Sequence, residues 1–136
     1  MAIEVHDPSM VGEVGSDLVI MELFRTYKVS YILKSTNANS ITQVIWEKDL
    51  AEQLIGELRK KFHEVTIRPV ALICVLGTNI ARPGILAKAT AALANNQINI
   101  ECVSQSLKQV NMQFVIQRER YKEGIIALHE ALCVNN

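Results

Sequence analysis

The chain repeats itself, and this repeat limits its fold more than any other feature of the sequence. A segment that begins at Gly15 matches one that begins at Gly84, 69 positions later, in the order of its apolar residues. A shift of 70 positions then aligns the segments that begin at Thr42 and Met112. The offset changes within a turn, where an inserted residue costs little. We therefore interpret the sequence as two copies of one unit, namely residues 1–69 and residues 70–136.

The second copy shows the order of the secondary-structure elements clearly. Residues 70–76 form a continuous apolar run that is typical of a buried strand. Residues 98–104 and 110–117 alternate between apolar and polar side chains, which also predicts strands. Apolar residues at helical spacing predict one helix around residues 86–93 and a last helix with four large residues on one face, namely Tyr121, Ile125, Leu128 and Leu132.

The first copy repeats this order of elements. It has predicted strands over residues 29–35 and 40–46, and a closing strand over residues 65–67. Trp46 aligns with Ile116 at the shift of 70 positions, so we expect Trp46 to lie in the core. Each copy thus has the order strand, helix, strand, strand, helix and strand, although the last strand of the second copy is missing.

This order predicts an α+β fold of two tandem ferredoxin-like βαββαβ units, each with an antiparallel sheet and both helices on one face. After the last predicted helix, only residues 133–136 remain, which are too few for a closing strand. An open sheet edge of this kind is a liability in a free monomer. We therefore expect that the missing strand comes from residues before Met1 or that another chain fills the edge.

Composition argues against several classes of function. The chain has 14 basic and 14 acidic residues, whereas a nucleic-acid-binding surface needs clustered positive charge. No apolar run approaches the roughly 18 residues of a membrane span, so no membrane partner is expected. Cys74, Cys102 and Cys133 are too far apart for a disulfide framework or a metal site, which is typical of a cytoplasmic protein. Cys74 and Cys102 lie on apolar strand faces and are expected to be inert core residues.

No catalytic constellation is visible, and we predict no catalytic residue and no metal site. His6, His63 and His129 fall on different elements and have no spacing typical of catalysis. An RNA-binding sheet of this fold would need exposed aromatic residues on its central strands, whereas Phe114 and Trp46 align with core positions.

The candidate binding sites are the two loops that join the first strand of each copy to its first helix, residues 8–17 and 77–84. Glycines in these loops let a ligand approach the backbone, and a helix N-terminus offers unpaired N–H groups to a carboxylate such as that of an amino acid. Nearby strand ends would add polar groups, namely Ser35, Thr36, Asn37, Asn39, Gln105, Ser106 and Asn111. The alternative is that these glycines and polar residues only form turns.

At these loops the sequence resembles a known family. The runs VALICVLG at residues 70–77, RPGIL at 82–86 and QINI at 97–100 resemble an ACT domain, the amino-acid-sensing module. With VNMQFV at residues 110–115 and ALHEAL at 127–132, the tandem arrangement is similar to the C-terminal regulatory region of aspartokinases, over essentially the whole chain. The resemblance implies an enzyme that phosphorylates L-aspartate with ATP in the aspartate-family amino-acid pathway, which includes lysine biosynthesis. Its upstream kinase domain would hold ATP and Mg²⁺, so no cofactor is expected within these residues.

The resemblance also implies an assembly and a set of contacts. In aspartokinases a strand from just before the first unit completes the second, and the first units of two chains pair into a homodimer that binds the effector in its interface. By resemblance, the effector-binding positions of the first unit are Met10, Gly12, Glu13, Val14, Gly15, Ser16, Asp17, Tyr31, Ile32, Thr36 and Asn37. The corresponding loop and strand ends of the second unit are Asn79, Ile80, Ala81, Arg82, Pro83, Gly84, Gln105 and Asn111.

Two departures from the family concern the effector. Lysine-sensitive members have an aspartate where this chain has Ile32, and a glutamate where it has Ala38. Isoleucine cannot neutralise an ammonium, and an unpaired buried charge is costly. This argues against lysine feedback of the usual kind and leaves threonine, another ligand or no effector open. The runner-up function is a non-catalytic ACT-pair regulator or small subunit that binds an amino acid without an attached kinase.

Overall fold

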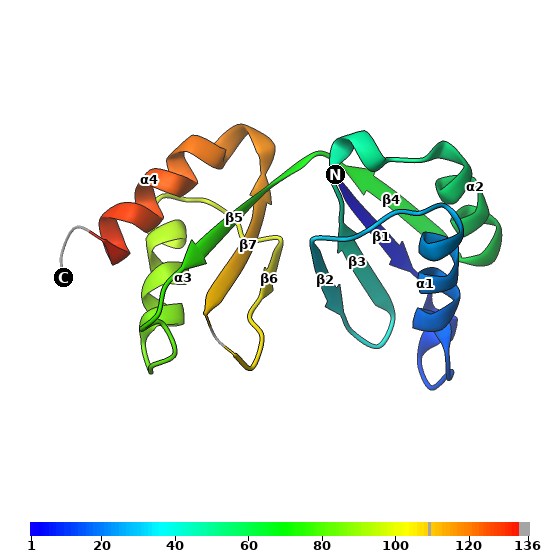
Figure 1. Cartoon of the computed structure of the whole chain (residues 1–136), viewed down its shortest axis with the longest axis horizontal. Helices are drawn as coiled ribbons and strands as arrows, with labels where there is room; N and C mark the ends of the chain where they lie inside the picture. Colours follow the sequence, from blue (N-terminus) through cyan, green and yellow to red (C-terminus); the bar gives the residue numbers. More distant parts are fainter. Residues whose placement is uncertain (109, 134–136) are drawn as a thin grey trace. The chain divides into compact units, whose positions relative to one another are not determined.

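The computed structural model of the chain describes residues 1–108 and 110–133. It divides the chain into two compact units, Met1–Arg68 and Pro69–Asn136, one residue before the boundary that the repeat predicts (Figure 1). Each unit combines an antiparallel sheet with two α-helices, so the predicted fold class is confirmed.

Unit 1 is a complete βαββαβ sandwich. Its elements are β1 (Ala2–His6), α1 (Ser16–Thr26), β2 (Leu33–Thr36), β3 (Ser40–Val44), α2 (Glu52–Lys61) and β4 (Glu64–Arg68). The sheet has the order β2-β3-β1-β4 with antiparallel pairs throughout. Ile3 and Val5 of β1 and Ile41 of β3 form one core with Phe24 of α1 and Leu58 of α2, so both helices cover the same face of the sheet (Figure 1).

Unit 2 has the same elements up to its second helix. They are β5 (Val70–Leu76), α3 (Ile85–Asn95), β6 (Cys102–Ser104), β7 (Asn111–Gln117) and α4 (Tyr121–Leu132). The sheet has the order β5-β7-β6. No strand corresponds to β4 within residues 69–108 and 110–133, so the described part of unit 2 has the open edge at β5 that the sequence predicts.

The two units share unusual backbone conformations at matching positions. Gly15 and Gly84 precede α1 and α3 with φ angles of 91° and 92°. Lys28 and Gln97 follow these helices with φ angles of 57° and 55°. Residues with a Cβ rarely adopt such left-handed angles. The repeat is therefore present in the backbone as well as in the sequence.

The prediction that Trp46 lies in the core is wrong, because the two β-hairpins differ in length: Lys34 pairs with Gln43, nine positions later, whereas Val103 pairs with Phe114, eleven positions later. Val5 pairs with Ile41 in unit 1, and Val75 pairs with Met112 in unit 2, so the offset between β3 and β7 is 71. At this offset Trp46 corresponds to the polar Gln117. Trp46 is accordingly 61% exposed.

The predicted core positions of the cysteines and of the last helix are also partly wrong. Cys74 lies opposite Gln113, on the face of the sheet away from α3 and α4, and is exposed, while Cys102 is only partly buried. On α4 the buried residues are Gly124, Ala127 and Leu128, whereas Tyr121 and Ile125 are exposed.

The exposure of Ile125 follows from the open edge of β5. Ile125 lines a groove of 200 Å³ together with Ile73 and Val75 of β5. In unit 1 the corresponding edge, that of β1, is covered by β4. The described residues of unit 2 supply no such strand, so the side of α4 that carries Ile125 keeps its contact with solvent.

We predict that Arg120 holds the end of α3 against the start of α4. Its guanidinium donates hydrogen bonds to the carbonyl oxygens of Asn96 and Gln97, at 3.0 Å and 3.3 Å, and it pairs with Glu123. Because a cation at a helix C-terminus stabilises the last carbonyl groups, R120A should lower the free energy of unfolding by about 1 kcal/mol. Urea denaturation followed by circular dichroism measures this, with K122A as the control. An R120A effect no larger than that of K122A contradicts the prediction.

Candidate functional site

The loop between β1 and α1 is anchored by Asp7. The Oδ1 atom of Asp7 accepts hydrogen bonds from the backbone N–H and the hydroxyl of Ser9, at 2.9 Å and 2.7 Å. Its Oδ2 atom accepts one from the backbone N–H of His63, at 3.0 Å. The hydroxyl bond from Ser9, followed by the two backbone bonds, holds the pKa of Asp7 below its ordinary value of 3.8. One carboxylate thus ties the start of the loop to the segment that precedes β4.

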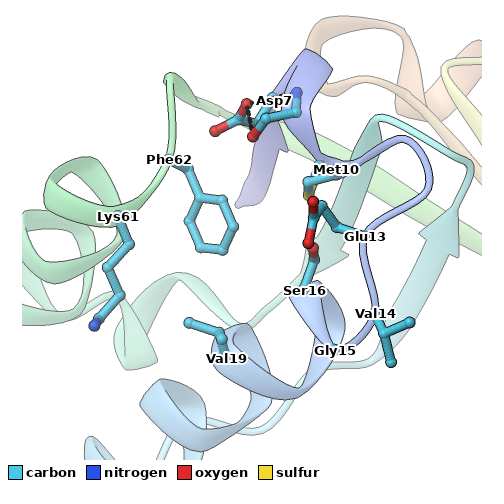
Figure 2. A pocket seen from close by; sticks show the side chains of 10 residues that line it. Asp7, Met10, Glu13, Val14, Gly15, Ser16, Val19, Lys61 and Phe62 are labelled. Carbon is cyan, nitrogen blue, oxygen red and sulfur yellow. Dashed lines mark hydrogen bonds between the residues drawn. The ribbon is translucent and has the colours of Figure 1, made fainter.

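A pocket of 470 Å³ lies between this loop, the first turns of α1 and the end of α2 (Figure 2). Its lining consists of Asp7, Ser9, Met10, Glu13, Val14, Gly15, Ser16, Val19, Lys61 and Phe62. Figure 2 shows the ring of Phe62 inside the pocket and Val14 pointing away from it. Glu13 and Lys61 lie on opposite sides of the Phe62 ring in this view.

The pocket offers groups of both charges to a ligand. Gly15 has no side chain that could cap α1, so the N–H groups of the first helical turn are open to an anion. The carboxylate of Asp7 already accepts three hydrogen bonds. The carboxylate of Glu13 has no ion pair or hydrogen bond with any residue in the described ranges, and it can bind an ammonium group. Together these groups suit a zwitterion such as an amino acid.

The structure places only some of the predicted residues of unit 1 at the pocket. Five of them line it, namely Met10, Glu13, Val14, Gly15 and Ser16. The others are not part of its lining: Gly12, Asp17, Tyr31, Ile32, Thr36 and Asn37. Asp17 forms an ion pair with Lys34 of β2 instead. The hairpin after β2 reaches the loop through a hydrogen bond from the N–H of Asp7 to the carbonyl of Asn39, at 3.0 Å.

Sequence reasoning missed four residues of the lining, namely Asp7, Val19, Lys61 and Phe62, and it placed Ser9 in the candidate loop without singling it out. Asp7 could have been found, because aspartate before proline and serine is a typical helix-capping pattern. Lys61 and Phe62 lie far along the chain and reach the pocket only through the packing of α2. No local pattern in the sequence indicates that contact.

Unit 2 has a smaller pocket of 290 Å³ at the corresponding loop. Of the predicted residues, Asn79, Ile80 and Arg82 line it, whereas Ala81, Pro83, Gly84, Gln105 and Asn111 do not. Its charged lining residues are Arg82 and Lys88, without a carboxylate. The pocket of unit 1 therefore fits a zwitterion better than the pocket of unit 2.

The residues that the structure describes contain no group of three histidine, cysteine, aspartate or glutamate side chains placed to hold a metal ion. None of their helices is long and apolar enough to cross a membrane.

We predict that D7N destabilises unit 1 in a pH-dependent way. The pKa of Asp7 is lowered by folding, so its contribution to stability is present above pH 3.8 and is lost as the pH falls through the folded-state value. D7N should therefore lower the Tm at pH 7, and the difference from the wild type should vanish in acid. Thermal denaturation across this range measures the effect, with E13Q as a control that removes an unpaired carboxylate. A Tm difference that persists unchanged in acid contradicts the prediction.

The chain is similar to known aspartate kinases. Residues 73–132 match the profile of the ACT domain family. "Aspartate kinase Ask_Ect" of Stutzerimonas stutzeri is 37% identical over 133 residues, which cover 96% of this chain and 28% of that protein. The chain thus spans only about a quarter of the length of its curated relatives.

Solved structures show the same fold. The aspartate kinase of Clostridium acetobutylicum superposes with a TM-score of 0.86 at 23% identity, over 96% of this chain and 32% of that one. The regulatory subunit of aspartate kinase from Thermus flavus superposes with a TM-score of 0.80 at 17% identity, over 96% of this chain and 90% of that one. The fold, the family profile and the sequence similarity agree. Unit 2 matches the ACT domain family, and the chain as a whole resembles aspartate kinases in sequence and their regulatory subunits in fold.

Proposed function

We propose that this chain is the regulatory region of an aspartokinase and that it binds an amino-acid effector in the pocket of unit 1. The observation that carries the proposal is the pocket itself, where the open N-terminus of α1 and the free carboxylate of Glu13 face one cavity. The 37% identity to an aspartate kinase supports the choice of enzyme. ATP and Mg²⁺ would bind to a kinase domain outside these residues, and the enzyme would work in the cytoplasm.

The lining suggests how an amino acid would bind. Its carboxylate would accept hydrogen bonds from the N–H groups of the first turn of α1, beside Ser16. Its ammonium would face Glu13, and its side chain would pack against Met10, Val19 and the ring of Phe62. Differential affinity for two states of the protein would then transmit binding to the kinase.

The charges of the pocket disfavour lysine as the effector. Lysine has two ammonium groups, while Asp7 is occupied by hydrogen bonds and only Glu13 is free among the acidic lining residues. The second ammonium would remain unpaired beside Lys61, at a cost in free energy. An amino acid with an uncharged side chain, such as threonine, fits the lining better.

An amino-acid screen by thermal denaturation tests the proposal. We expect an uncharged amino acid to raise the Tm of the chain, because a ligand at 100 times its Kd stabilises the folded state by about 2.7 kcal/mol. E13Q should abolish the shift, whereas E52Q, which removes an exposed carboxylate of α2 outside the pocket, should leave it unchanged. A screen without any shift, or with the largest shift from lysine, contradicts the proposal.

Exposed apolar residues support a homodimer through the first units. Val11, Val14 and Leu18 are exposed around the start of α1, and Val14 is 99% exposed. Exposed apolar side chains that lie close together often mark protein–protein contacts. We therefore propose that two chains form a homodimer through this part of unit 1.

We predict that V14D weakens this dimer. A carboxylate in an apolar interface must lose its hydration on association, which should raise the dimer dissociation constant at least about tenfold. Sedimentation equilibrium measures the change. L107D is the matched control, because Leu107 is equally exposed but belongs to unit 2. A monomeric wild type, or equal effects of both substitutions, contradicts the prediction.

A separate regulatory subunit is the second candidate. The chain covers 90% of the regulatory subunit of aspartate kinase from Thermus flavus, so the same fold exists as a polypeptide of similar length. In this case the same pocket would bind the effector, and the kinase would be a different chain. Copurification of an aspartate kinase of separate mass with the natural protein would favour this candidate.

A further inference from the structure

The apolar layer between the sheet and the helices of unit 1 contains an unexpected polar row. Lys34 of β2 lies directly opposite Gln43 of β3, and Gln43 lies opposite Ile3 of β1. Residues opposite one another in an antiparallel pair share a face, and Ile3 belongs to the core under the helices. Lys34 and Gln43 therefore point toward the helices, and Gln43 is 0% exposed.

Unit 2 shows that the fold does not require these polar residues. At the same place in its sheet, Val103 of β6 lies opposite Phe114 of β7, which lies opposite Ile73 of β5. At the offset of 69 that aligns the two N-terminal glycines, Asp17 of α1 corresponds to Leu86 of α3. Unit 2 thus has three apolar residues, namely Leu86, Val103 and Phe114, at the positions where unit 1 has Asp17, Lys34 and Gln43.

The three polar side chains form one cluster. The ammonium of Lys34 donates a hydrogen bond to Oδ2 of Asp17, and the side chain of Lys34 is only 19% exposed. Neither Oδ1 of Asp17 nor the amide of Gln43 has a hydrogen-bond partner among the described residues. The amide of Gln43 lies on the same face of the sheet as Lys34, and its donor and acceptor atoms are both available to this ion pair. A buried amide dipole interacts with a nearby charge more strongly than a solvated one does.

Asp17 connects this cluster to the pocket of unit 1. Asp17 is in the first turn of α1, next to Ser16, which lines the pocket. A carboxylate at this position opposes the positive potential that would attract an anionic ligand to the helix N-terminus. Lys34 neutralises it, and because the side chain of Lys34 is largely buried while that of Asp17 is half-exposed, solvent screens the pair only from the side of Asp17.

We propose that Asp17 and Lys34 determine the affinity of the unit 1 pocket for carboxylate ligands through their charge balance, with Gln43 as the buried dipole that accommodates it. The proposal rests on the proposed function, since it concerns the same pocket. It assigns a role to residues that do not touch the ligand. They act on it through the electrostatic potential at the first turn of α1.

The two partners of this ion pair should have opposite effects on binding. K34M leaves the charge of Asp17 uncompensated, which should weaken the binding of a carboxylate ligand roughly threefold to tenfold. D17N instead leaves the positive charge of Lys34 uncompensated, which should tighten the binding of a carboxylate ligand by a similar factor. The double variant D17N/K34M removes both charges and should restore an affinity near that of the wild type. A purely structural ion pair would instead lose affinity with either substitution.

Isothermal titration calorimetry of the folded chain tests this order, with the amino acid found by the screen as one probe and inorganic phosphate as the other. K48M, which removes an exposed lysine of unit 1 outside the cluster, is the matched control and should bind like the wild type. If K34M does not fold, the comparison of wild type, D17N and D17N/K34M still gives the sign.

The two probes separate the two proposals. If no amino acid binds but phosphate follows the expected order, the proposed effector function fails and the inference stands. If an amino acid binds and K34M and D17N both weaken it, or neither changes it, the inference is overturned and the effector function stands. Absence of binding by both probes overturns both.

Discussion

The entry of the chain into α1 through Gly15 is the constraint on which the pocket of unit 1 depends. At a φ of 91° a residue with a Cβ would be strained by about 1 kcal/mol or more. The same glycine lacks the oxygen with which serine, threonine or aspartate would cap the helix. Because no side chain caps the helix, the first N–H groups of α1 stay accessible from the loop. Asp7 then fixes the far end of that loop, so the pocket has two anchored sides.

The duplication provides an internal comparison between two copies of one backbone. Gly84 reproduces the angle of Gly15, and both units keep a residue with positive φ after the first helix. Their chemistry has nevertheless diverged. Unit 2 keeps Val103 and Phe114 in the layer where unit 1 has Lys34 and Gln43, and its pocket has only basic charged residues. Shared geometry with different side chains is a common way in which one fold serves different sites.

The order of elements, the duplication and the loops at the helix N-termini could be predicted because they depend on local patterns. Glycine before a helix and alternation along a strand are visible in a single sequence. Trp46 was misplaced because the hairpin of unit 2 is longer, and a slip of one residue moves a strand side chain to the other face. Ile125 was misplaced because periodicity shows which side of a helix is apolar and does not show whether a strand covers it. Phe62 entered the site only through tertiary packing, for which no local pattern exists.

The exposed position of Trp46 has a practical consequence. It is the only tryptophan of the chain and belongs to unit 1, next to the 3₁₀ turn that follows β3. Indole emission therefore reports on unit 1 alone, while unit 2 contributes only the fluorescence of Tyr121. An exposed indole also emits at long wavelength in the folded state, so unfolding should change its intensity more than its colour. Trp46 is thus an intrinsic fluorescence probe of unit 1, whose pocket is larger than that of unit 2.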